Sequence, residues 1–246
     1  MRALTGLAAA GILWAGQASA VTDYDACVAL VAADPRQAEI EAGDWARFGG
    51  GGAPARHCYA LALIETGAPS RAIDELIGIA MEEPDLGDPE RADILGQAGN
   101  LLMQEGDAVT ANVVAGQALR LDAANPAALA LRARLKLEAG EPRAAIRDLD
   151  AALQARPATV DFLLLRASAY RQLELFVQAR DDASFASENA PEDAEVWLER
   201  GLAEAGLDDR PAARKSFLEA ISLDREGLIG KSAQRALQRM DAGISD

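Results

Sequence analysis

The stretch that decides the fold is AEVWLERGLAEAGLDDRPAARKSFLEAISLDREG, residues 194–227. Its apolar spacing predicts two amphipathic helices joined by a turn at Asp208, with small residues at Gly201 and Ala213 where the two backbones approach closely. Small residues recur at both places every 34 residues upstream, followed seven residues later by a third column of alanine. Recurrence at a fixed period is typical of stacked helical repeats. The three columns are Gly99, Ala133, Ala167 and Gly201; Ala111, Ala145, Ala179 and Ala213; and Ala118, Ala152, Ala186 and Ala220.

These columns resemble the tetratricopeptide repeat family, which has a bulky residue at position 4, small residues at 8, 20 and 27, and a large residue at 24. The resemblance implies an all-α fold, a right-handed α-solenoid of stacked antiparallel helix pairs, because one pair alone cannot bury its apolar face. In one unit Ala183 stands where the large residue is expected, and we expect Phe185 to fill that space. The units are expected at about 53–86, 92–125, 126–159, 160–193 and 194–227, with about five residues inserted near 85–89, a degenerate helical unit and Gly-rich linker over 21–52, and a polar-faced capping helix over 228–241.

The first 20 residues have the pattern of an export signal. Arg2 precedes an apolar run, and Ala18-Ser19-Ala20 offers a small-x-small cleavage site. A membrane anchor is the alternative, but it needs about 20 apolar residues, and Gln17 interrupts the run. We therefore expect 1–20 to be a cleavable signal peptide of an exported bacterial member of the family. The mature protein would be periplasmic or secreted and would not insert into a membrane.

Cys27 and Cys58 are the two cysteines of the chain. An even pair in an oxidising compartment favours a disulfide. The alternative is an enzyme or a thiol-redox protein with a site near Cys27, His57 and Cys58, which would require a free thiolate. The pair does not form a C-x-x-C motif, and His57 is the one histidine. We predict no catalytic residue, no metal site and no cofactor.

The formal net charge of −15, from 39 acidic and 24 basic residues, repels phosphate backbones and makes nucleic acid a poor partner. Another protein or a peptide segment is the expected partner, and self-association through the ends of the stack is a further possibility.

In the tetratricopeptide family the first helix of each pair lines a concave groove. The resemblance therefore implies a groove for a partner segment and a non-catalytic scaffold or assembly factor of the bacterial periplasm. Asn100 and Arg134 occupy places comparable to a carboxylate clamp of the family, but the lysines of that clamp are absent. The groove candidates are Asn100, Met103, Arg134, Leu137, Leu164, Ser168, Arg171 and Leu198.

Overall fold

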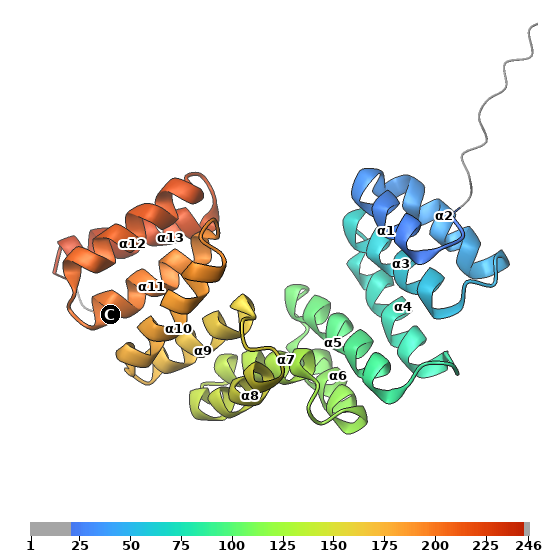
Figure 1. The fold of residues 1–246 in the computed structure, drawn as a ribbon, viewed down its shortest axis with the longest axis horizontal. Helices are drawn as coiled ribbons and strands as arrows, with labels where there is room; N and C mark the ends of the chain where they lie inside the picture. The colour runs from blue at the N-terminus through green and yellow to red at the C-terminus, as the bar shows by residue number, and fades with distance from the viewer. Residues whose placement is uncertain (1–20, 244–246) are drawn as a thin grey trace, which may run out of the picture.

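The computed structural model describes residues 21–243, which form thirteen α-helices and contain no β-strand. Neighbouring helices stack in antiparallel pairs, as the repeat predicts (Figure 1). The predicted signal peptide lies outside the described residues. The helices are α1 (Tyr24–Ala33), α2 (Pro35–Phe48), α3 (Gly52–Glu65), α4 (Pro69–Glu82), α5 (Asp88–Gln104), α6 (Ala108–Leu121), α7 (Pro126–Glu138), α8 (Pro142–Ala155), α9 (Val160–Gln172), α10 (Phe176–Asn189), α11 (Ala194–Gly206), α12 (Arg210–Leu223) and α13 (Leu228–Asp241).

The stack is curved, and its odd-numbered helices lie on the inner side. From α5 to α13, each odd helix packs against the next odd helix, whereas successive even helices of the described chain do not contact one another. The even helices therefore splay apart on the convex side. In Figure 1 the two ends of the chain form two arms that face each other across the hollow.

The small-residue columns lie inside the helix pairs, as expected. At Gly99 and Gly201 even a methyl group would crowd a neighbouring side chain. A Cβ atom on Gly201 would lie 2.6 Å from the ring of Phe217, and one on Gly99 would lie 2.2 Å from Leu131 of the next pair. Such distances are too short for van der Waals contact, so an alanine would force the Phe217 ring or the end of the Leu131 side chain to shift.

The turns within the five repeat pairs share one conformation. The residue at position 15 of each unit has a positive φ, and the residue after it donates a backbone hydrogen bond to the carbonyl five residues back. This is the Schellman arrangement that ends helices. Glycine occupies three of the five places, but Glu174 and Asp208 adopt φ 57° with a side chain attached. The five residues are Gly67, Gly106, Gly140, Glu174 and Asp208.

Two units contain the same ion pair between their two helices, in which a partly exposed arginine binds a buried aspartate. Arg132 donates two hydrogen bonds of 2.8 Å to Asp148, and Arg166, 34 residues later, does the same to Asp182. Burial alone would raise the pKa of Asp148, but hydrogen bonds from Arg132 and Lys136 outweigh it and lower the pKa below the usual 3.8. A paired charge tolerates burial because its hydrogen bonds replace those of water.

The units before and after these two have other residues at the positions of the ion pair. In the preceding unit the two positions hold Ala98 and Val114, which are buried and apolar. In the following unit Arg200 bonds to Glu204 at 2.8 Å, and Glu204 accepts a 2.6 Å bond from Ser216 on the facing helix. An apolar pair and a rearranged polar network thus replace the ion pair without leaving a buried charge alone.

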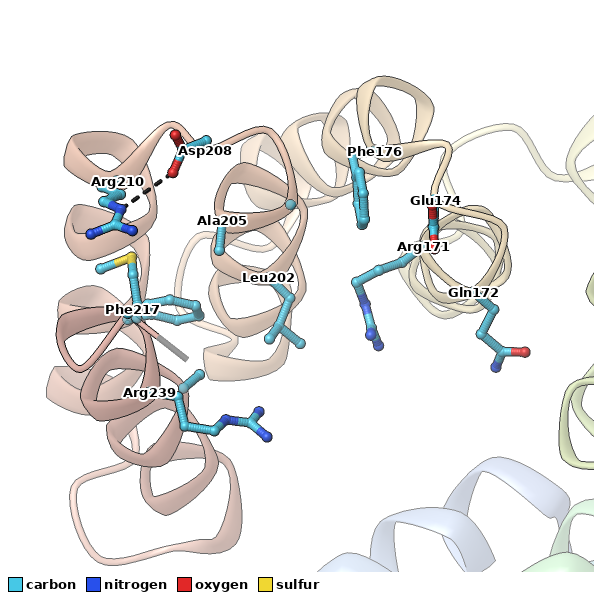
Figure 2. Close-up of a pocket in the computed structure, with 14 residues that line it drawn as sticks. Arg171, Gln172, Glu174, Phe176, Leu202, Ala205, Asp208, Arg210, Phe217 and Arg239 are labelled. Carbon is cyan, nitrogen blue, oxygen red and sulfur yellow. Dashed lines mark hydrogen bonds and ion pairs between the residues drawn. The ribbon is translucent and has the colours of Figure 1, made fainter. Parts of the chain in front are cut away.

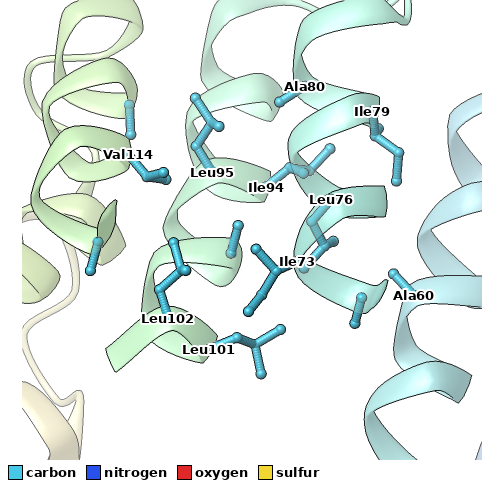
Figure 3. Close-up of a cluster of buried hydrophobic side chains, with 14 of the residues drawn as sticks. Ala60, Ile73, Leu76, Ile79, Ala80, Ile94, Leu95, Leu101, Leu102 and Val114 are labelled. Atoms are coloured by element: carbon cyan, nitrogen blue, oxygen red, sulfur yellow. The ribbon is translucent and has the colours of Figure 1, made fainter. Parts of the chain in front are cut away.

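The hydrophobic core runs through the stack as several clusters, of which the largest extends from α3 to α7 (Figure 3). One expectation about the core was wrong. Phe185 does not fill the space beside Ala183, because its side chain is 44% exposed. Ala183 packs instead with Ala167, Ala203 and the half-buried Tyr170, so the neighbouring helices are joined there by small side chains.

An inserted loop separates the second helix pair from the third. It follows α4, and α3 consequently has no backbone packing against α5 within the described chain. Arg91 holds this loop, because its guanidinium donates to the carbonyls of Ala80 at 2.6 Å, Glu83 at 2.5 Å and Leu86 at 3.0 Å. One side chain thus satisfies carbonyls that the end of α4 leaves without helical partners.

Candidate functional site

The eight groove candidates come from α5, α7, α9 and α11, which lie on the inner side of the curve. Seven of them are half-buried, so part of each side chain is exposed to solvent. Leu164 is the eighth and is only 6% exposed, because it belongs to the cluster of buried residues around α7 to α11. It leaves little surface for a partner to contact. Met103, Leu137 and Leu198 pack on the core and remain partly open.

The middle of the concave face carries one arginine among carboxylates. Arg134 of α7 makes no hydrogen bond or ion pair with any residue of the described chain, although its charge acts on Glu195 of α11. The pKa of Glu195 is raised, first by burial and then by the negative charges of Asp193, Glu199 and Asp161, which outweigh the opposing effect of Arg134. A cation without a fixed partner is available to a ligand that enters the hollow.

Arg171 of α9 has a partner within the chain. Its guanidinium donates to both carboxylate oxygens of Glu199, at 3.1 and 3.3 Å, and the Glu199 side chain is 12% exposed. The same guanidinium borders a pocket toward the C-terminus. Arg171 is therefore fixed in direction before any ligand arrives.

Two adjoining pockets, of about 540 and 680 Å³, lie at the C-terminal end of the concave face. Their walls come mainly from α9, α11 and α13, with the turns after α9 and α11 and with Phe176 of α10 and Arg210 and Phe217 of α12. Figure 2 shows Arg171 and Arg239 extending toward the same space, with Leu202 between them. The repeat pattern predicts only a capping role for α13 and does not indicate its part in this wall. Arg235 and Arg239, one helical turn apart, were the available signal.

The N-terminal cysteines are close together. The sulfur atoms of Cys27 in α1 and Cys58 in α3 lie at disulfide distance, with Cα atoms 6.2 Å apart, and both residues are fully buried. His57 beside them contacts Tyr24 Oη through Nδ1 at 2.7 Å and Gln97 Oε1 through Nε2 at 2.8 Å. The histidine thus links α1, α3 and α5, and neither cysteine of the described chain is a free thiol.

Metal-binding and membrane-spanning features were sought in the same part of the chain. Residues 21–243 contain no group of three or more His, Cys, Asp or Glu side chains placed to hold a metal ion. No helix among them has the length and apolar character needed to cross a bilayer.

Comparison with solved structures finds tetratricopeptide repeat proteins. A chain of the Cut9–Hcn1 hetero-tetramer of the APC/C matches with a TM-score of 0.75 at 17% identity, over 88% of this chain and 42% of that one. MamA from Desulfovibrio magneticus RS-1 matches with a TM-score of 0.57 at 23% identity, over 72% of this chain and 97% of MamA. A thermophilic TPR protein of Thermus thermophilus gives 0.54 at 22% identity, over 62% and 82%.

These matches show that the chain has the fold of tetratricopeptide repeat proteins, and at such identities they show the fold alone. The chain spans less than half the length of the Cut9–Hcn1 component that it resembles. No family model and no curated protein sequence matches the chain.

Proposed function

We propose that this chain is a non-catalytic scaffold or assembly factor of the bacterial periplasm that binds a segment of a partner protein along its concave face. The observation that carries the proposal is the half-buried row on α5 to α11, where apolar side chains stand next to Arg134, a cation with no ion pair in the described chain. Half-exposed apolar area and an unpaired charge on one concave surface are what a bound protein segment can cover and satisfy.

Two further observations support a protein partner and a location outside the cytoplasm. A chain of the same fold occurs in a complex with another protein in the Cut9–Hcn1 hetero-tetramer, which is in keeping with a protein partner. The signal-like pattern before Val21 and the close pair Cys27 and Cys58 support an oxidising compartment outside the cytoplasm.

A photo-crosslinking amino acid placed on the concave face tests the proposal in the living cell. We expect a crosslinker at Leu137, on the inner side, to capture a defined partner in the periplasmic fraction. A crosslinker at Val113, which is 54% exposed on the even helix α6, should not capture it. The location is read from the same fractions by immunoblotting.

A charge reversal shows whether capture depends on the concave surface. Arg134→Glu should abolish crosslinking from Leu137, because it places one more negative charge beside Glu195. The matched control is Arg143→Glu, the same change on an exposed arginine of the even helix α8. Equal capture from Leu137 and Val113, or equal effects of the two reversals, would contradict binding on the concave face.

A further inference from the structure

The C-terminal end of the concave face has the opposite charge to the chain as a whole. The protein carries 39 acidic and 24 basic residues, yet the two adjoining pockets are bordered by four arginines and only two carboxylates. The pocket nearer α13 has arginine and no acidic residue in its wall. The charged residues of the two walls are Arg171, Arg210, Arg235 and Arg239, with Glu174 and Asp208.

The arginines differ in how far the chain itself neutralises them. Arg171 is paired with Glu199, and Arg210 lies 3.2 Å from Asp208. Arg235 donates a 2.9 Å hydrogen bond to the hydroxyl of Ser232 and has no ion pair within residues 21–243. Arg235 therefore has no carboxylate at ion-pair distance within the described chain.

Apolar side chains lie between these cations. Leu198 and Leu202 of α11 and Ala236 of α13 share the wall with Arg235, and Met240 joins the wall on the Arg171 side. Figure 2 shows Leu202 directed into the space between Arg171 and Arg239. The volumes of about 540 and 680 Å³ lie within the range of ligand sites and suit a short piece of chain.

We propose that this surface, formed by α9, α11 and α13, docks an acidic peptide segment whose carboxylates alternate with apolar side chains. The carboxylates would pair with Arg235, and the apolar side chains would cover Leu198 and Leu202. A long polyanion such as nucleic acid is disfavoured, because it would run from the pocket toward Asp161 and Glu195 on the same concave face. The inference rests on the proposed function, since it specifies the chemistry of the partner segment.

Fluorescence anisotropy with designed peptides tests this assignment. The probe is a fluorescein-labelled, C-terminally amidated peptide of Glu and Leu with Ser spacers, and the counter-probe carries Lys in place of Glu. Both are titrated with the mature, disulfide-intact protein. The Glu peptide should bind and the Lys peptide should not. Binding should weaken as salt rises from about 0.1 to 1 M, because the screening length falls from about 10 to 3 Å.

Two matched variants locate the binding. Arg235→Glu should raise the Kd of the Glu peptide about three- to tenfold, since it removes one attraction and adds one repulsion at a partly solvated site. Lys231→Glu makes the same charge change on α13 outside both pocket walls, and should change the Kd less than twofold. Arg235→Gln should fall between the two. Helix content and unfolding temperature, measured for each variant, show that only folded proteins are compared.

The proposal would be overturned by equal binding of the Glu and Lys peptides, by no binding of the Glu peptide, or by equal effects of Arg235→Glu and Lys231→Glu. If those results occurred while Leu137 still captured a partner in cells, only the acidic-segment assignment would fail. If capture from Leu137 also failed, concave-face binding itself would be wrong.

Discussion

The contact between Gly201 and Phe217 leads to a prediction in which two identical substitutions have opposite effects. Alanine is favoured over glycine inside a helix by about 1 kcal/mol, so Gly→Ala normally stabilises one. At Gly116 in α6 the new Cβ would meet only the Nη1 atom of Arg120, at an ordinary 3.7 Å. Gly116→Ala should therefore raise the free energy of unfolding by up to about 1 kcal/mol.

At Gly201 the new Cβ would clash with a buried side chain. The Cβ would lie 2.6 Å from two carbons of the Phe217 ring, and Phe217 is 1% exposed and cannot swing aside. Overpacking of this kind costs about 1–3 kcal/mol, which cancels or exceeds the gain in helix propensity. We expect Gly201→Ala to range from neutral to about 2 kcal/mol destabilising, which places it about 1–3 kcal/mol below Gly116→Ala.

A second substitution tests the cause. Gly201→Ala combined with Phe217→Leu recreates the pair that Ala133 and Leu149 already form in another unit, where both are fully buried. The double variant should be more stable than the sum of the single effects by about 1 kcal/mol or more.

Urea unfolding followed by circular dichroism measures the free energies. Hydrogen exchange of α11 and α12 gives the local effect, since repeat arrays can open in part. If Gly201→Ala stabilised the protein as much as Gly116→Ala, or if the double variant showed no coupling, the packing argument would be wrong.

Three further substitutions or treatments give shorter tests. Glu174→Gly should stabilise the protein by about 1 kcal/mol, measured by urea unfolding, because it removes a side chain from a left-handed turn. Because the pKa of Asp148 is lowered in the folded state, its stabilising effect is present above pH ~4 and is lost as pH falls through the folded-state pKa. The free energy of unfolding, measured at decreasing pH, should therefore fall more steeply for wild type than for Asp148→Asn. Reducing the bond between Cys27 and Cys58, 31 residues apart, should cost about 3–4 kcal/mol by loop entropy, and hydrogen exchange should increase mainly in α1 to α3.

The fold could be predicted because close packing of the paired helices requires small residues at the same positions of every unit. Only Gly or Ala fits where two backbones meet, so positions such as Ala145 and Ala179 stand out at a constant spacing without any alignment. The turn at Glu174 was harder to foresee, because a left-handed residue is expected to be glycine and the surrounding hydrogen bonds impose that conformation on glutamate.

The candidate site was only partly predictable, because sequence position gives the direction of a side chain but not its neighbours. Leu164 was expected to line the groove, but it is 6% exposed and packs within a buried cluster. Arg171 points into the hollow and is already bonded to Glu199. The place of Arg235 in the pocket wall could not be predicted, because it depends on how α13 packs against α11, which the 34-residue period does not specify.

The loop that Arg91 holds has a mechanical consequence for the whole array. An insertion between repeats is a natural place for a hinge, but here the guanidinium of Arg91 in α5 binds three carbonyls of α4 and the loop. We therefore expect bending to be spread over many helix contacts, as in a spring, rather than concentrated at this joint. The two ends of the array would then move relative to each other gradually, through small changes in many contacts, rather than by rotation about one loop.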